Sequence, residues 1–302
     1  MNQLFNPFDK NISVIIPTTC EKHRKLMLKR AVESVLAQSG LDVELILVVN
    51  GDHFDREMLE SYKSNKRISI IQIAEGNVSV ARFIGLQVTK HDFFCFLDDD
   101  DEFLIGGLKR RVELFAQFPH ADVIVTNGYS HKNFDVPLVN GLSEVEINNN
   151  PGATILKFNW FASLAPTFRK TTVDDSFFKL TLAHFEWTYI FFLLSSSGKI
   201  ILYNDCFTYR RYENNPSSAS KSLDYAKFYP QFLKQLRELP LDVELQQKIS
   251  MKYVAALNGL SNLFLENNNY MGAWYMHLKC LRYGGWRFLP YTRHLFSYRR
   301  IN

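Results

Sequence analysis

Four consecutive aspartates, Asp98–Asp101, follow the apolar run Phe93–Leu97. Adjacent like charges repel, and the repulsion grows as water is removed, so such a run needs open solvent or a cation. The preceding run is apolar on both faces, which predicts a central parallel strand, and open α/β sheets bind ligands beyond the carboxyl ends of such strands. In extended backbone, Asp98 and Asp100 point to the same side. The run therefore predicts a divalent cation, held through oxygen by Asp98 and Asp100, that can bridge to a diphosphate.

A simpler interpretation applies to the end of the run. Asp101 and Glu102 would favour the N-terminus of a following helix through the helix dipole. This accounts for those two residues and leaves Asp98 and Asp100 unexplained.

The elements that must position these residues follow from the pattern of the first half. Short β-branched runs alternate with amphipathic stretches, as in parallel strands joined by helical crossovers. The predicted strands are Ile12–Ile16, Val43–Val49, Ile68–Ile73, Phe93–Leu97 and Asp122–Thr126. The predicted helices are Arg24–Gln38, Arg56–Ser64, Val80–Val88 and Leu104–Gln117. We expect an α/β fold with a Rossmann-like, mostly parallel sheet flanked by helices.

The pattern changes in the second half. It weakens from Gly128 to Gly152, where "INNNPG" indicates a loop, before a helix over Ala183–Ser196 and a strand over Lys199–Tyr209. The polar stretch "RRYENNPSSASKS", residues 210–222, is typical of a flexible flap or linker, because Asn, Pro and Ser favour turns. Beyond Leu223 the pattern is helical, with long runs at Val243–Phe264 and Tyr270–Arg282.

Composition limits the class of protein. Of 302 residues, 46% are hydrophobic and 14% aromatic, as in a globular protein, and the formal net charge is only +4. The four cysteines form no C-x-x-C pair, which argues against a zinc site or a disulfide framework. The start "MNQLFNPFDK" lacks the apolar core of a signal peptide, and no apolar run reaches the roughly 18 residues of a membrane-spanning helix. We therefore expect a cytoplasmic protein.

Four segments together resemble a known family. They are "ISVIIPTT" at Ile12–Thr19, "VELILVVNGD" at Val43–Asp52, "NVSVARFIGL" at Asn77–Leu86 and "FLDDDDEFLIGGL" at Phe96–Leu108. Their order and spacing resemble those of family 2 glycosyltransferases with the GT-A fold, over about residues 10–212. The resemblance implies an inverting transferase that uses a nucleotide-diphosphate sugar, most commonly UDP-linked, with Mg²⁺ or Mn²⁺. Such enzymes commonly build bacterial surface polysaccharides such as lipopolysaccharide and capsule.

The resemblance also implies roles for single residues on the donor side. Asp98-x-Asp100 matches the D-x-D motif, which assigns Asp98 and Asp99 to the donor and Asp98 and Asp100 to the metal. Pro17 and Thr18 match the loop that lies against the nucleotide, although Pro17 would also end a strand. Arg82 matches an arginine near the base and diphosphate, its alternative being an exposed helix residue. Asn50 stands where the family often has an acidic residue that reads uracil, and its amide can still pair with a base edge.

Glu186 is the expected general base of the transfer. An inverting displacement needs a carboxylate to take the proton of the acceptor hydroxyl. The resemblance supplies it from an E-D-W-like motif, and aligning Trp187 in "LAHFEWTYIFFLL" selects Glu186, with Phe185 in the preceding acidic position. The alternative is an ordinary polar residue on an aromatic helix. His184 is a weaker candidate, and Arg210 or Arg211 could neutralise leaving-group charge or lie at the surface.

These expectations combine into one hypothesis and its competitors. We expect a GT-A catalytic domain over residues 1–215 and a helical C-terminal extension over residues 216–302, acting on a glycan or lipid-linked acceptor. A non-catalytic protein that binds sugar nucleotides or glycans is the alternative, supported by Phe185. A nucleotidyltransferase would be expected to carry a Gly-rich loop after the first strand, and "PTTCEKHRK" has no glycine.

The end of the chain suggests a further partner. Beyond Glu266 there is no acidic residue. Aromatic and basic residues alternate there: Trp274, Lys279, Arg282, Trp286, Arg287, Phe288, Tyr291, Arg293, Phe296, Tyr298, Arg299 and Arg300. This combination is typical of segments that bind an anionic membrane surface, here the inner face of the plasma membrane. The alternative is that the aromatic residues pack on the catalytic domain. We expect no nucleic-acid binding, because no matching basic motif accompanies the tail.

Overall fold

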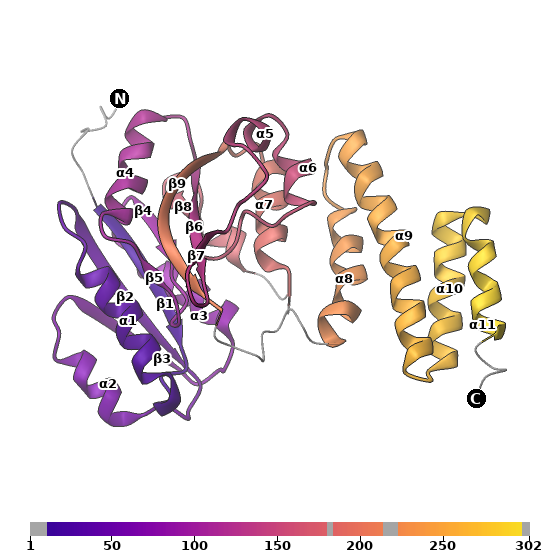
Figure 1. Ribbon diagram of the computed structural model, residues 1–302. Helices are drawn as coiled ribbons and strands as arrows, with labels where there is room; N and C mark the ends of the chain where they lie inside the picture. Colours follow the sequence, from indigo (N-terminus) through magenta and orange to yellow (C-terminus); the bar gives the residue numbers. More distant parts are fainter. Residues whose placement is uncertain (1–10, 180–183, 214–222, 298–302) are drawn as a thin grey trace. The chain divides into compact units, whose positions relative to one another are not determined.

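The computed structural model describes residues 11–179, 184–213 and 223–297. The chain divides into two compact units. Figure 1 shows the chain coloured by residue number. The first unit comprises Met1–Thr181 and Leu193–Asn214, and the second comprises Leu182–Phe192 and Asn215–Asn302. The segment "MNQLFNPFDK", residues 214–222 of the expected flap, and Tyr298, Arg299 and Arg300 of the tail lie outside the described residues.

The described strands of the first unit form one mixed sheet, in the order β3-β2-β1-β4-β8-β6-β9-β5, with β7 paired to β6. The strands are β1 (Asn11–Thr18), β2 (Asp42–Asn50), β3 (Ile68–Ile73), β4 (Phe93–Phe96), β5 (Glu102–Phe103), β6 (Val123–His131), β7 (Asp135–Pro137), β8 (Pro166–Arg169) and β9 (Ile201–Tyr212). The pairs β1–β2, β1–β4, β2–β3 and β6–β9 are parallel. β8 runs antiparallel to both β4 and β6, so it joins two parallel parts of the sheet.

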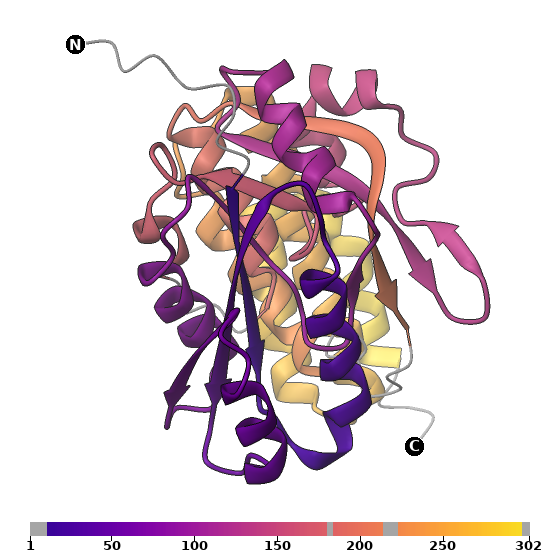
Figure 2. The ribbon, with the colours of Figure 1, turned by 90° about the vertical axis from the view of Figure 1, so that its left-hand side faces the viewer.

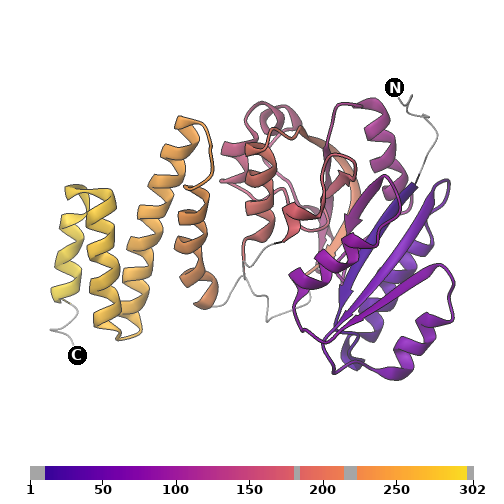
Figure 3. The same cartoon turned by 180° about the vertical axis from the view of Figure 1, so that it is seen from behind.

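Helices cover both faces of this sheet, as Figures 1 and 3 show for α1 and α3. The helices of the first unit are η1 (Lys22–Arg24), α1 (Lys25–Leu36), α2 (Arg56–Lys63), α3 (Val78–Gln87), α4 (Gly107–Gln117), α5 (Glu144–Asn149), α6 (Pro151–Ile155) and η2 (Asp175–Phe178). Gly85 lets α3 approach the sheet closely, because a Cβ there would lie 2.5 Å from a side-chain carbon of Ile15. This close packing fixes the helix that carries Arg82.

The predicted α/β fold is confirmed, with corrections between residues 128 and 170. The predicted strands correspond to β1, β2, β3, β4, β6 and β9. The region expected to be irregular instead continues β6 into a hairpin with β7 and then forms α5 and α6. "INNNPG" is not a loop, because Ser143 and Glu146 form a capping box for α5, and Asn150 caps α6 with Pro151 in its first turn. Figure 2 shows the β6–β7 hairpin extending from the sheet.

The second unit is helical. Its elements are the first part of α7 (Glu186–Ser196), α8 (Leu223–Leu236), α9 (Val243–Glu266), α10 (Tyr270–Gly284), η4 (Trp286–Tyr291) and α11 (Thr292–Ser297). Figures 1 and 3 show α8, α9, α10 and α11 side by side in succession. Leu265, Ala273 and Leu295 form a buried cluster that joins α9, α10 and α11. None of the described helices combines the length and apolar character needed to cross a bilayer.

Candidate functional site

The aspartate run lies directly after β4, at the carboxyl ends of the parallel strands. The strand ends at Phe96, and the Asp101 N–H donates to the Asp98 carbonyl oxygen at 3.2 Å, so the backbone turns here and is not extended. The side chains still alternate in environment, because Asp99 and Asp101 are buried whereas Asp98 and Asp100 are half-buried. The two less buried carboxylates are Asp98 and Asp100, the pair for which the sequence predicts a shared side.

Asp99 is held by donors from the first strand and the helix after it. Thr18 Oγ1 donates to Asp99 Oδ2 at 2.5 Å, and Arg24 Nε donates to the same oxygen at 2.8 Å. A second Arg24 nitrogen bonds the other carboxylate oxygen. Thr18 and Asp99 are buried, and the hydrogen bond between them together with the Arg24–Asp99 ion pair fixes the loop between β1 and α1 against the aspartate run.

Asp98 is held from two other elements. Arg82 Nη2 on α3 donates to Asp98 Oδ1 at 2.9 Å, and Ser163 Oγ donates to Asp98 Oδ2 at 2.6 Å. Arg82 is only 8% exposed, so it is not the surface residue of the alternative interpretation. Two arginines of the chain thus supply part of the positive charge that the aspartate run requires.

Asp100 has the weakest partners among these carboxylates. Its Oδ2 lies 3.4 Å from an Arg24 nitrogen, and its backbone carbonyl accepts from Arg30. Burial raises the pKa of the Asp100 carboxyl, and the charges of Asp98 and Asp99 raise it further, against the opposing effect of Arg24. The negative charge of Asp100 is therefore compensated by fewer hydrogen-bond donors than the charges of Asp98 and Asp99.

Asp101 and Glu102 do not cap the next helix, contrary to the simpler interpretation. α4 begins at Gly107, after Gly106 in left-handed backbone with φ of 74°. Asp101 instead accepts from the Tyr212 N–H at 2.8 Å, and Glu102 pairs with Arg210 in the β5–β9 ladder. Burial raises the pKa of Asp101 well above its ordinary value, and Asp98 and Asp100 raise it further. Both residues therefore attach the run to the end of β9.

The ends of β1 and β2 complete the arrangement. Asn50 Nδ2 donates to the Thr18 carbonyl oxygen at 3.0 Å, and both residues are buried. Pro17 is buried in β1 opposite Val48 of β2. The structure thus joins all the predicted donor residues, Pro17, Thr18, Asn50, Arg82, Asp98 and Asp99, at one edge of the sheet.

The carboxylates suit a divalent cation. Among the described residues, no group of three or more His, Cys, Asp or Glu side chains is arranged to hold a metal ion. An ion at Asp100 and Asp98 would therefore take further oxygen ligands from a diphosphate and water, as Mg²⁺ commonly does. The half-buried, weakly paired Asp100 carboxylate fits that role.

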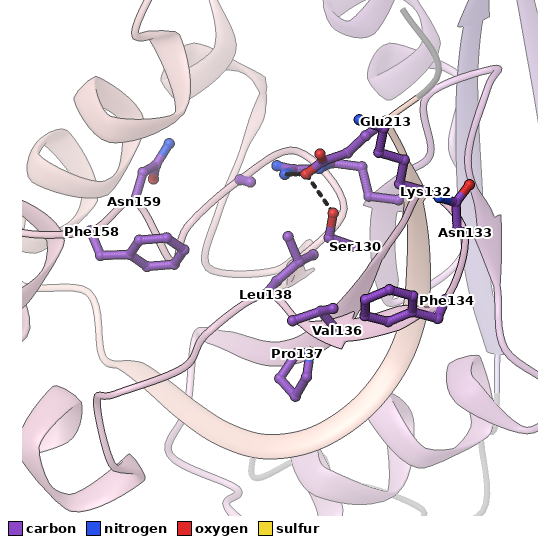
Figure 4. Close-up of a pocket in the computed structure, with 12 residues that line it drawn as sticks. Ser130, Lys132, Asn133, Phe134, Val136, Pro137, Leu138, Phe158, Asn159 and Glu213 are labelled. Atoms are coloured by element: carbon purple, nitrogen blue, oxygen red, sulfur yellow. Dashed lines mark hydrogen bonds and ion pairs between the residues drawn. The ribbon is translucent and has the colours of Figure 1, made fainter.

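A pocket of about 600 Å³ lies beside the β6–β7 hairpin and the end of β9. Figure 4 shows Phe158 and Asn159 on one side of it and the hairpin residues Phe134, Val136 and Leu138 on the other. Sequence neighbours of two of its lining residues contact the aspartate run. Its lining residue Ala162 precedes Ser163, which donates to Asp98, and its lining residue Arg211 precedes Tyr212, which donates to Asp101.

The pocket combines apolar and polar walls. Phe134 is 72% exposed, and Phe158 and Val136 are also exposed. Lys132 and Arg211 supply positive charge, part of which Glu213 offsets through an Arg211 contact of 3.2 Å. Aromatic faces beside amide and charged groups are suited to an oriented polar ligand.

Glu186 is the first residue of α7, in the second unit. The preceding Phe185 has φ of 64°, an uncommon backbone conformation for a bulky residue. Its ring stacks on Phe232 at 4.8 Å between centroids and contacts Tyr229, and His184 contacts Phe228. Aromatic packing within this unit therefore fixes the start of the helix that carries Glu186.

Several partners were not selected from the sequence. Arg24, Arg30, Ser163 and Tyr212 all contact the run, and Arg30 Cζ lies 3.5 Å from the centre of the Tyr212 ring. The basic stretch directly after "PTT" was a usable signal for Arg24, because a positive segment follows a strand whose end carries the site. Ser163 has no local signal. Arg210 is committed to Glu102 and Asp135, which argues against a role with the leaving group.

The fold is that of a GT-A protein, in which a mixed sheet presents the aspartate run beside the loop that follows β1. The sequence model of glycosyl transferase family 2 matches residues 13–182, more than half of the chain, and the chain belongs to this family.

The chain is also similar to named glycosyltransferases. The Staphylococcus aureus poly(ribitol-phosphate) beta-N-acetylglucosaminyltransferase TarP is 32% identical over 175 residues, which cover 55% of this chain and 51% of TarP. The chain thus spans about half the length of TarP. The Streptococcus pneumoniae glycosyltransferase GlyG is 26% identical over 238 residues, which cover 72% of this chain and 76% of GlyG.

Solved structures support the fold. S. aureus TarS 1–349 in complex with UDP-GlcNAc superimposes with a TM-score of 0.63 at 15% identity, covering 90% of this chain and 81% of that chain.

Proposed function

We propose that the protein is an inverting glycosyltransferase that moves a sugar from a nucleotide-diphosphate donor, UDP-linked, to a glycan or lipid-linked acceptor of a bacterial surface polysaccharide. One observation carries this proposal. The aspartate run is bonded on one side by Thr18 of β1 and on the other by Ser163, which follows the pocket residue Ala162. This arrangement supports a nucleotide on the β1–β2 side, the diphosphate at the run and the acceptor in the pocket, the order that a transferase needs.

Hydrogen bonds within the protein hold the proposed donor residues together. Pro17, Thr18 and Asn50 are assigned to the nucleotide, and Arg82, Asp98 and Asp99 to the ribose and diphosphate. The hydrogen bonds among these residues lower the cost of ordering them on binding. TarS has been solved with UDP-GlcNAc and TarP is named for N-acetylglucosamine transfer, which support UDP-GlcNAc as the first donor to test.

Mg²⁺ or Mn²⁺ would be held by Asp100 and Asp98, and when bound it would neutralise charge on the diphosphate. The acceptor oxygen forms its bond to the anomeric carbon as the bond from that carbon to the diphosphate oxygen breaks. Glu186 takes the proton of the acceptor hydroxyl, and the electron pair leaves with the nucleoside diphosphate. Packing of Phe185 on Phe232 fixes the backbone directly before Glu186, which supports an ordered carboxylate.

The first test asks whether the protein binds and uses a donor. A panel of nucleotide sugars should include one that raises the melting temperature more with Mn²⁺ than with chelator, because a ligand of the folded state stabilises it. The same donor should be slowly hydrolysed or transferred. Stabilisation without any turnover would instead support the non-catalytic alternative. No stabilisation by any nucleotide sugar would contradict both.

The pocket is proposed as the acceptor subsite, with sugar rings packed on Phe134 and Phe158. Phe134→Ala should lower the rate of transfer roughly tenfold by weakening acceptor binding, on the scale of one buried aromatic contact. Hydrolysis of the donor should not change, because the residue lies outside the donor network. Val145→Ala, at a 67% exposed position of α5, is the matched control. Equal loss of hydrolysis and transfer in Phe134→Ala would contradict the assignment.

We also propose a cytoplasmic location, peripheral to the inner face of the plasma membrane. A lipid-linked acceptor would require it.

A further inference from the structure

The helix α10 is apolar on two opposite faces. Ala273, His277 and Cys280 are buried against the rest of the unit. Met271, Tyr275 and Leu278 occupy the other side and are 87%, 55% and 58% exposed. Their spacing of four and three residues places them in one stripe along the helix. An ordinary surface helix has one apolar face and a polar one, so the exposed stripe is unexplained by folding of this unit.

Positive charge surrounds this stripe. Arg282 follows Leu278 by one turn on the same side and is exposed, and Lys279 Nζ lies 4.2 Å from the centre of the Tyr275 ring. Just beyond α10, Trp286 is 84% exposed and is followed by Arg287. No acidic residue follows Glu266 in the sequence, so none of this charge is offset from the same segment.

Trp274, on the same helix, has a different environment. Trp274 packs on the buried cluster of Leu265, Ala273 and Leu295, and its ring contacts Phe296 at 5.1 Å between centroids. Packing within the unit therefore accounts for Trp274. It does not account for Met271, Tyr275, Leu278 and Trp286.

We propose that this face, made of Met271, Tyr275, Leu278, Arg282, Trp286 and Arg287, binds the surface of an anionic lipid bilayer. Apolar and aromatic side chains enter the interface, while Arg and Lys attract anionic headgroups. A second copy of the chain fits the face less well, because a two-fold contact would bring the same arginines together. The inference concerns the second unit alone and does not depend on the transfer reaction.

Vesicle flotation of the full chain tests it. The parent should float with phosphatidylcholine vesicles that contain phosphatidylglycerol, and less so without it or at high salt. The double variant Tyr275→Ser, Leu278→Ser should bind at least tenfold more weakly, because it removes two apolar contacts. Met251→Ser is the matched control, since Met251 is a 53% exposed residue of α9 outside the face. Equal flotation of all three would overturn the proposal.

Further measurements test the role of the arginine charges and distinguish the bilayer from other occupants of the face. Arg282→Gln with Arg287→Gln should weaken binding to anionic vesicles roughly tenfold or more and leave the melting temperature unchanged. Tryptophan fluorescence of the parent should shift to the blue on vesicle binding. Trp286→Phe should still float but should lose that shift.

If the parent does not bind vesicles but self-associates, and Tyr275→Ser with Leu278→Ser abolishes that association, the face is a contact between copies and the proposal fails. Asp100→Asn should float like the parent, so loss of catalysis is not mistaken for loss of binding.

Discussion

At the scale of single residues, the aspartates differ in how many donors each one already has. Both oxygens of Asp98 and of Asp99 accept from side chains, whereas among the described residues the Asp100 carboxylate has one side-chain partner, Arg24 at 3.4 Å. Asp100 is thus the carboxylate with most capacity for an added cation.

Asp100→Asn should abolish turnover and the Mn²⁺-dependent part of donor stabilisation, because it removes the ligand charge while keeping the shape. The melting temperature without ligand should stay the same or rise, since a repelled charge is removed. Thermal denaturation and a donor-hydrolysis assay measure both effects. Asp42→Asn is the control, because this exposed carboxylate lies at the opposite end of β2. Full activity of the parent in chelator would rule out the assignment.

Glu186→Gln should lower the catalytic rate about a hundredfold or more, the usual scale for losing acid–base assistance. Donor affinity should not change, because the substitution removes a proton acceptor and no donor contact. Steady-state kinetics with saturating donor measure the effect, and Glu238→Gln, an exposed carboxylate on the same unit, is the control. If the variant turns over like the parent, the base is another residue.

Sequence motifs located the residues of the site but not their partners. Pro17, Asn50, Arg82 and the D-x-D run lie in four recognisable segments, each adjacent to a strand end. Ser163 bonds Asp98 across 65 positions of sequence, in a part of the chain with no periodic pattern. Such a contact depends on how β8 enters the sheet, which no local pattern encodes.

At the scale of elements, burial decides which strands were predictable. β1 and β2 have long runs buried on both faces, so their composition is continuously apolar. β8 has only four residues, begins with proline and runs antiparallel between two strands, so it resembles a loop in sequence. The small helices α5 and α6 depend on side-chain caps and have little apolar periodicity.

The contact between α10 and α11 leads to a pH prediction. His277 is only 1% exposed, its Nε2 lies 2.7 Å from Thr292 Oγ1, and burial lowers its pKa below the ordinary 6.5. The folded state disfavours the imidazolium, so the unfolded chain takes up a proton first as the pH falls. The contribution of neutral His277 to the free energy of unfolding is therefore fully present above about pH 6.5 and is lost progressively below it.

His277→Gln should show a smaller decrease in melting temperature than the parent between about pH 7 and pH 5, because the titrating group is gone. Circular dichroism of the helical signal measures it. His53→Gln is the control, since the His53 side chain is 90% exposed. Parallel pH profiles for the parent and His277→Gln would contradict the argument.

At the scale of the whole molecule, the chain passes between its two units three times, after Thr181, Phe192 and Asn214. The expected division near residue 215 lies at the last of these passages. Nothing in the helical pattern of Ala183–Ser196 indicated that its first part would belong with the C-terminal helices. That assignment follows from ring contacts such as Phe185 with Phe232, which are remote in sequence.

A consequence is that the second unit consists of two segments that are separate in sequence, as in a split protein. They are a short strip, Leu182–Phe192, and a long piece, Asn215–Asn302. Residues 1–214 and 215–302, expressed as separate polypeptides, should reassemble by fragment complementation, because the strip carries Phe185 to its site on Phe232 and Tyr229. Co-purification through a tag on one fragment measures this, and Phe185→Ala should weaken it, whereas Val145→Ala should not. Fragments that fail to associate would show that covalent continuity, and not the aromatic strip, holds the helices in place.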